Sequence, residues 1–116
     1  MDRATDNPGA VSLDEVFEQL AARRRRYVLY ELQDEDHVER PELARRVAAR
    51  ERGCDVDDVA SSDLERMEIS LHHRELPQLH EAKFLQYDER QGDVSVTQYF
   101  DLVEKYLQLA REDERN

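Results

Sequence analysis

Five polar side chains in the segment 66–78 have the chemistry that recognition of DNA requires. They are Arg66, Ser70, His73, Arg74 and Gln78. Arginine can form two hydrogen bonds with guanine, glutamine can do the same with adenine, and serine can contact a base or a phosphate. A helical step of about 100° per residue directs these side chains outward, or to the flank, when Ile69, Leu76 and Leu79 face the interior. The alternative is a solvated helix face in a protein that is charged throughout.

Three histidines in the same part of the chain raise the question of a metal site. His73 and His80 are seven residues apart and share a helix face, and Cys54 is the one thiol. Metal sites usually need three or four ligands with supporting partners, and no second thiol exists here. His72 falls on an apolar stripe, where histidine is more often a satisfied core residue. We therefore expect no metal and no other cofactor, and we expect Cys54 to be inert.

No pattern in the sequence indicates catalysis. Acidic residues are abundant, but no pair has a distinctive spacing, and the sequence contains neither a glycine-rich phosphate loop nor a nucleophile elbow. The acidic segment 51–63 lacks the ligand ladder and the glycine of an EF-hand. We expect that the protein is not an enzyme.

The charges are the most unusual feature of the composition. The 116 residues include 28 acidic and 17 basic residues, for a net charge of −11, and 15 of the basic residues are arginine. Acidic excess with little lysine is typical of proteins that stay soluble in molar salt, where the Debye length falls to about 3 Å. The composition therefore predicts a salt-loving source organism. A single cysteine and the lack of a long apolar run predict a cytoplasmic protein without membrane association.

Apolar periodicity predicts four helices in the first two thirds of the chain. They run from Leu13 to Leu20, from Arg23 to the polar cluster 34–37, from Pro41 to Gly53, and from about Ser62 to Ala82. Ser12 and Glu15 form a capping box before the first helix. An acidic connection (53–62), with a short turn around 56–59, precedes the fourth helix.

The fourth helix carries two apolar stripes on nearly opposite sides. One stripe consists of Ile69, His72, Leu76 and Leu79, and the other consists of Leu64, Met67 and Leu71. We expect the first stripe to face the core because it continues into the next element. Pro77 lies inside this helix, where it removes one backbone hydrogen bond and can kink the axis.

A β-hairpin is predicted after the fourth helix. Two short runs rich in β-forming residues, 84–88 and 93–97, flank the turn 89–92, which contains a glycine. Arg90 and Gln91 at the turn can meet a phosphate or the minor groove of DNA. A turn also favours such polar residues by itself, so both interpretations stay open.

The last predicted helix, 98–111, begins after Thr97 and carries an apolar band that is too wide for one contact surface. The band predicts packing on its own domain and on a second subunit. The residues expected at a dimer interface are Tyr99, Phe100, Leu102, Val103, Tyr106, Leu107 and Ala110.

The run Arg23–Arg26 has the charge of a phosphate-binding patch, but a helix turns through it. Some of its side chains must therefore point inward or toward neighbouring acids such as Glu15, Glu18 and Glu31. We expect one or two arginines to stabilise the fold through ion pairs and the others to face solvent or DNA.

The order of three helices, a long helix, a hairpin and a helix is that of a winged helix-turn-helix, in which a helix enters the major groove. The segments LAARRRRYVLYEL (20–32) and LHHRELPQLHEAKFLQYD (71–88) resemble ArsR-type winged-helix repressors. They are more similar still to a widespread haloarchaeal family of winged-helix proteins regarded as transcriptional regulators, which pairs an RRRRYVL stretch with ISLHH and LPQL (69–79). The resemblance covers about 12–97. Two features depart from it: the connection before the long helix is unusually long, and Lys83 stands where such proteins often carry glycine.

The sequence thus predicts a mainly α protein with a small β-hairpin (α+β), organised as a flexible tail (1–11), a winged helix-turn-helix domain (12–97) and a C-terminal dimerisation helix with a short tail (98–116). We expect a homodimeric transcriptional regulator that binds double-stranded DNA in a sequence-specific manner. The alternative is a winged-helix module that binds a protein partner, because a charge of −11 opposes contact with a polyanion at ordinary salt.

Overall fold

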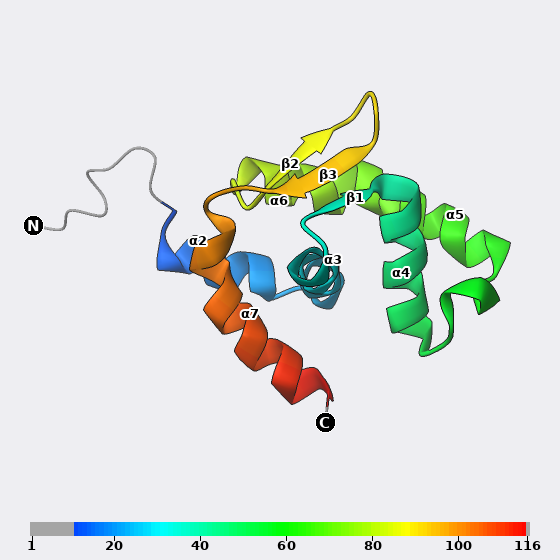
Figure 1. Cartoon of the computed structure of the whole chain (residues 1–116), viewed down its shortest axis with the longest axis horizontal. Helices are drawn as coiled ribbons and strands as arrows, with labels where there is room; N and C mark the ends of the chain where they lie inside the picture. Colours follow the sequence, from blue (N-terminus) through cyan, green and yellow to red (C-terminus); the bar gives the residue numbers. More distant parts are fainter. Residues whose placement is uncertain (1–10, 116) are drawn as a thin grey trace, which may run out of the picture.

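The computed structural model describes residues 11–115 and has a mainly helical fold with a small antiparallel sheet (Figure 1). The α-helices are α2 (Leu13–Leu20), α3 (Arg23–Asp34), α4 (Arg40–Arg52), α5 (Ser61–Ser70), α6 (Leu76–Glu81) and α7 (Phe100–Arg115). A 3-10 turn, η1 (Val56–Asp58), precedes α5, and a π-helical turn, η2 (Leu71–Glu75), joins α5 to α6. The α+β class is therefore confirmed. Of the predicted N-terminal tail (1–11), all but Val11 lies outside the described residues.

The helix ends follow the local signals in the sequence. The Glu15 amide donates a hydrogen bond of 3.1 Å to Ser12 Oγ at the start of α2. The carboxylate of Glu15 instead accepts from Gln19 Nε2 at 2.7 Å, so only half of the predicted capping box forms. Gly53 ends α4 with a φ of 67°, in the left-handed region that glycine adopts without strain.

The sheet has three strands, whereas the sequence predicted a two-stranded hairpin. The strands are β1 (His37–Glu39), β2 (Leu85–Asp88) and β3 (Asp93–Val96), in the spatial order β1-β3-β2. Both pairs are antiparallel, with Val94 of β3 opposite Val38 on one side and Tyr87 on the other. Strand β1 was missed because it is three residues long, begins inside a polar cluster, and buries only Val38.

The long helix buries part of each of its two predicted apolar stripes. Ile69 is 61% exposed, whereas Met67 and Leu71 are buried together with Leu76 and Leu79. The first half of the helix therefore uses one predicted stripe and the second half uses the other. The expectation that Ile69 faces the core was wrong.

The π turn η2 joins the two stripes into one buried face. The Leu76 amide donates to the Leu71 carbonyl, five residues back, so this turn contains one residue more than an α-helical turn. The extra residue rotates the following side chains by about 100° relative to a regular helix, which brings Leu76 and Leu79 into line with Met67. Pro77 accounts for the widened turn because it donates no hydrogen bond and its ring crowds the carbonyl four residues earlier.

Three of the four consecutive arginines in α3 hold other elements in place. Arg24 donates from Nε to Glu51 of α4 at 2.6 Å, and Arg25 lies 3.8 Å from the buried Glu75. Arg26 donates from both Nε and Nη2 to Glu114 of α7, at 2.9 and 2.8 Å. The prediction gave a structural role to one or two of these arginines, and the structure gives it to three. The partner acids were not predicted, because each lies far along the chain.

Helix α7 supplies part of the core, which corrects the predicted dimer interface. Phe100, Val103 and Leu107 are buried against the rest of the domain, so they are not available to a second subunit. Tyr99, Tyr106 and Ala110 are half-buried, and Leu102 is exposed. The apolar band is wide because one side of it closes the core and the other side stays at the surface.

Lys83 adopts the backbone conformation of a glycine. It follows α6 with a φ of 76°, the one positive φ at a non-glycine residue between 11 and 115. Its amide donates to the His80 carbonyl and the Phe84 amide donates to the Leu79 carbonyl, both at 3.0–3.2 Å. These two bonds form a Schellman motif, in which the residue at this position is usually glycine. The left-handed turn therefore forms with a lysine, at a cost in strain.

We predict that Lys83→Gly increases the free energy of unfolding by about 0.5–1 kcal/mol, because glycine removes the strain of a positive φ. Urea unfolding followed by circular dichroism measures the change. Lys83→Ala is the control: it removes the same side chain but keeps the strain, and should leave stability unchanged. Equal stability of the two variants would contradict the prediction.

Candidate nucleic-acid interface

The exposed side of the long helix (α5, η2 and α6) and the β2–β3 turn form one candidate surface, which we call the helix–hairpin surface. It comprises Arg66, Ile69, His73 and Arg74 on the helix and Arg90 and Gln91 at the turn. All six side chains are exposed. In Figure 1 the hairpin rises above the long helix, beside the start of α4.

Arg66 and Arg74 are the two arginines of the long helix on this surface. Their side chains are 77% and 70% exposed. Arg66 lies 3.7 Å from Asp63, which already accepts a shorter bond of 2.7 Å from Arg52. Arg74 donates only through Nε, to Glu75 at 3.2 Å. The π turn takes up one extra residue between Arg66 and Arg74. The two arginines therefore lie two turns apart and project from nearly the same side of the long helix.

One of the predicted DNA-contacting residues is not free to reach outward. Ser70 is half-buried, and its hydroxyl accepts from Arg24 Nη1 at 3.0 Å and donates to Glu75 Oε2 at 3.2 Å. The prediction misplaced Ser70 because it assumed a regular helix with Ile69 inside. Gln78 is half-buried, and its contact with DNA stays a prediction. His73 is exposed, as predicted.

The acidic residues along this stretch are largely neutralised by arginine. Between 61 and 75, Asp63 pairs with Arg52, Glu68 with Arg40, and Glu75 with Arg74. Glu65 is the one carboxylate in this fully described stretch without an arginine within ion-pair distance. In a protein with a net charge of −11, this stretch of the long helix is therefore close to neutral. The β2–β3 turn is acidic, because Asp88, Glu89 and Asp93 surround Arg90.

A hydrogen-bond chain fixes the hairpin against the long helix. Arg40, the first residue of α4, donates from Nη1 to the Tyr87 hydroxyl at 2.7 Å and from Nε to Glu68 at 3.2 Å. The Tyr87 hydroxyl lies 2.6 Å from His72 Nδ1. Because arginine can only donate, the Tyr87 hydroxyl accepts from Arg40 while it bonds the His72 ring. The Arg40 amide also donates to the Gly92 carbonyl at 2.7 Å.

Arg40 and Tyr87 position the hairpin and were not among the residues predicted from the sequence. Arg40 is one of 15 arginines, and Tyr87 reads as an ordinary strand residue, so composition gives no signal for either. His72 was assigned to the core stripe; it is half-buried and bonded to Tyr87 instead. The one sequence signal for this role was that His72 is the polar residue on an otherwise apolar stripe.

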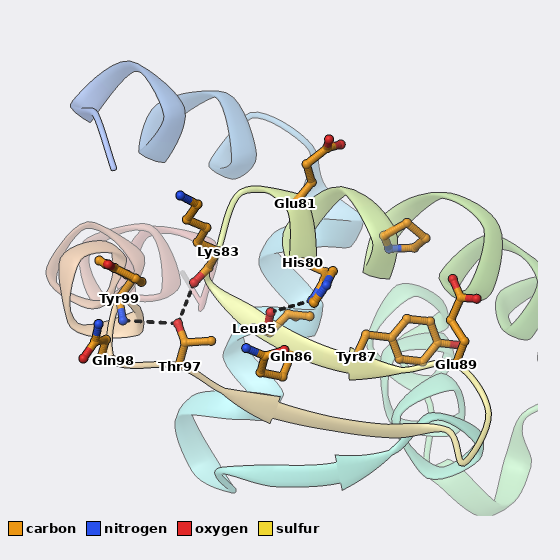
Figure 2. A pocket seen from close by; sticks show the side chains of 11 residues that line it. His80, Glu81, Lys83, Leu85, Gln86, Tyr87, Glu89, Thr97, Gln98 and Tyr99 are labelled. Atoms are coloured by element: carbon orange, nitrogen blue, oxygen red, sulfur yellow. Dashed lines mark hydrogen bonds between the residues drawn. The ribbon is translucent and has the colours of Figure 1, made fainter. Parts of the chain in front are cut away.

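The far end of the hairpin is held beside α6 and the start of α7. Figure 2 shows a hollow lined by these segments. His80 Nδ1 lies 3.2 Å from the Leu85 carbonyl, and the Thr97 hydroxyl donates to the Lys83 carbonyl. Thr97 Oγ1 in turn accepts from the Tyr99 amide at 3.2 Å, as expected of a helix cap. These bonds fix the end of the long helix relative to the sheet.

Among the described residues, no three potential ligands of the His, Cys, Asp and Glu types lie close enough to hold a metal ion. Cys54 is exposed after the end of α4. Within 11–115, none of the helices combines the length and the apolar character that crossing a bilayer requires.

The chain belongs to the family described as Domain of unknown function (DUF7344), whose model matches residues 17–95. The match begins in α2, contains the long helix and the hairpin, and ends in β3 before α7. No curated protein and no solved structure matches the chain. The similarity to ArsR-type repressors and to haloarchaeal regulators therefore stays a prediction from the sequence.

We predict that Tyr87→Phe loosens the hairpin and lowers the free energy of unfolding by about 1–2 kcal/mol, because Arg40 and His72 lose their shared partner. Amide hydrogen exchange should accelerate in β2 and β3 but not in α7. Tyr99→Phe is the control, since no side-chain hydrogen bond involves its hydroxyl among the described residues. Unchanged exchange in the hairpin would contradict the proposed role of Tyr87.

Proposed function

We propose that the protein is a transcriptional regulator that binds double-stranded DNA through the helix–hairpin surface. The observation that carries the proposal is that Arg66 and Arg74 project together from an exposed, nearly neutral helix beside a fixed hairpin. Arginine on an exposed helix can donate two hydrogen bonds to guanine in the major groove.

The order of the elements supports the same proposal. Helix α3, strand β1, helix α4, the long helix and the β2–β3 hairpin follow one another, with the sheet in the order β1-β3-β2. This succession is the one expected for a winged helix-turn-helix, in which the helix before the hairpin reads the groove. The hairpin turn, with Arg90 and Gln91 exposed, would then contact the DNA backbone or the minor groove.

The acidic net charge limits the conditions under which binding can occur. At low salt a charge of −11 repels DNA over long distances. At about 2 M KCl the Debye length is below about 3 Å, so local arginine contacts decide the outcome. The composition is that of a protein that works in such salt, and binding should be measured there.

Capture of genomic fragments by the purified protein in about 2 M KCl, followed by sequencing, tests the function. Enrichment of promoter fragments that share an inverted repeat would support a sequence-specific regulator. No enrichment by folded protein would favour the alternative, a module that binds a protein partner. The acidic charge and the exposed Ile69 on the long helix are the observations that favour that alternative.

We predict that Arg74→Glu reduces the affinity for an enriched duplex at least about tenfold, because it replaces a charged donor by a group that repels phosphate. Fluorescence anisotropy in about 2 M KCl measures the affinity. Arg115→Glu makes the same charge change at the end of α7, away from the hairpin, and should bind like the wild type. If the two variants bind equally well, Arg74 does not contact DNA.

We propose that the regulator is a homodimer formed through an apolar surface on α2 and α7. The side chains of this surface that remain accessible include Phe17, Tyr106 and Leu109, of which Phe17 and Leu109 are 49% and 63% exposed. The Phe17 and Tyr106 rings pack edge to face, with centroids 5.2 Å apart. Two copies of this surface would bury apolar side chains that are otherwise in water.

We predict that Leu109→Glu converts the dimer into a monomer without unfolding the domain, because it places a charge in an apolar interface. Multi-angle light scattering at high salt measures the mass. Gln108→Glu adds the same charge one position away, next to Gln33 of α3, and should remain dimeric. A wild type that is monomeric at high protein concentration would contradict the proposal.

A further inference from the structure

A hollow of about 270 Å³ opens where α3 meets the last turns of α4 and α7. It is lined by Tyr27, Tyr30, Arg50, Arg111, Glu114 and Arg115. In Figure 1 the Gly53 end of α4 and the C-terminal end of α7 lie at the bottom, away from the hairpin at the top. The hollow is thus separate from the helix–hairpin surface.

The lining holds more guanidinium groups than carboxylates, and two of its arginines pair with acids outside it, Arg50 with Glu31 and Arg111 with Asp34. Three guanidinium groups face one carboxylate, in a protein with a net charge of −11. That carboxylate, Glu114, already accepts two bonds from Arg26 and one from the Tyr30 hydroxyl at 2.5 Å. The Arg26 guanidinium holds the pKa of Glu114 below its usual range, so the carboxylate stays ionised and occupied.

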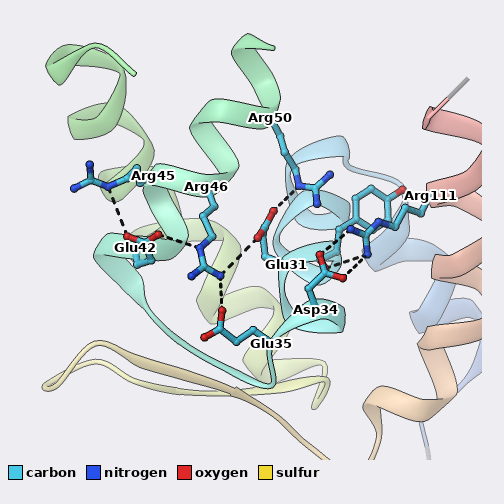
Figure 3. A network of polar contacts seen from close by, with 9 residues as sticks. Glu31, Asp34, Glu35, Glu42, Arg45, Arg46, Arg50 and Arg111 are labelled. Carbon is cyan, nitrogen blue, oxygen red and sulfur yellow. Dashed lines mark hydrogen bonds and ion pairs between the residues drawn. The ribbon is translucent and has the colours of Figure 1, made fainter. Parts of the chain in front are cut away.

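All three lining arginines have hydrogen-bond donors to spare. Arg50 donates from Nε to Glu31 at 2.6 Å, while its two terminal nitrogens have no partner among the described residues (Figure 3). Arg115 makes no hydrogen bond or ion pair with any described residue. Arg111 is the most occupied of the three: it donates to Asp34 from Nη1 and Nη2, at 3.0 and 2.8 Å, and to Gln33 from Nη1 at 3.0 Å, and only its Nε has no partner among the described residues.

The tyrosine rings hold the guanidinium groups in place. The Arg50 guanidinium carbon lies 5.5 Å from the centre of the Tyr30 ring and 6.0 Å from that of Tyr27, and Arg111 lies 5.4 Å from the Tyr30 ring. Such cation–π contacts restrain an arginine without using its N–H donors. The donors of Arg50 are therefore aimed in advance, which lowers the entropy cost of binding a ligand.

We propose that this hollow binds a small anion with several phosphate or carboxylate oxygens. Its volume lies just below the range of about 300–1,000 Å³ for typical small-molecule pockets, which fits a compact polyanion. The free donors of Arg50 and Arg115 would hold the anion. Arg115 would supply the charge, because Arg50 and Arg111 are already paired with Glu31 and Asp34. The bound anion would join α4 to α7, the helix that carries the proposed dimer surface. This inference does not depend on DNA binding.

Thermal unfolding with increasing pyrophosphate or citrate, with KCl lowered to keep ionic strength constant, tests the site. Both anions also stabilise proteins non-specifically, but that effect does not saturate. We expect a rise in Tm that saturates with at least one anion. Arg115→Gln should raise the half-saturating concentration about tenfold, the effect of losing one charge-assisted hydrogen bond. Arg45→Gln removes an exposed arginine elsewhere on α4 and should behave like the wild type.

The response identifies the chemistry of the ligand. Saturation with pyrophosphate alone would indicate phosphate groups, and saturation with citrate alone would indicate carboxylates; either result supports the proposal. Two results would overturn it: a rise that never saturates with either anion, or the same half-saturating concentration in Arg115→Gln as in the wild type. Loss of DNA binding would leave this measurement unaffected.

Discussion

The π turn between Leu71 and Glu75 is the constraint on which the rest of the structure depends. It follows from Pro77, which cannot complete a regular helix, and it lets one continuous helix bury Met67 at one end and Leu79 at the other. Because only the residues after the turn are rotated, the helix can bury Leu76 and Leu79 while Ile69 stays in solvent and Ser70 bonds Arg24 of α3. The residues that could meet DNA are therefore set by a backbone feature and not by the helical pattern alone.

Arginine has two distinct roles in this acidic chain. Inside the fold it joins elements that are distant in sequence: Arg24 joins α3 to α4, Arg26 joins α3 to α7, and Arg40 joins α4 to the hairpin. At the surface, Arg66 and Arg74 keep most of their side chains in solvent. Lysine could not replace the first group, because these bonds use the two-pronged geometry of the guanidinium.

Much of the fold could be predicted from local signals, and the parts that could not depend on distant contacts. The cap at Ser12, the end of α4 at Gly53 and the hairpin all follow from short patterns that act within a few residues. Strand β1 exists only because β3 pairs with it, so its own three residues do not predict it. The buried stripe of the long helix changes at the π turn. A pattern with a constant step of about 100° per residue does not include such a turn, so it could not predict which residues are buried.

The candidate site was predicted only in part for the same reason. Arg66, His73 and Arg74 were predicted to be exposed because polar residues recur at helical spacing. Ser70 was misplaced because the same spacing assumed a regular helix.

The proposed function requires that the helix–hairpin surface contacts DNA. Amide chemical-shift mapping in about 2 M KCl, with a captured duplex added to labelled protein, tests it most directly. We expect shifts concentrated at residues 62–74 and 89–92; shifts confined to α2 and α7 would show that DNA does not bind the helix–hairpin surface.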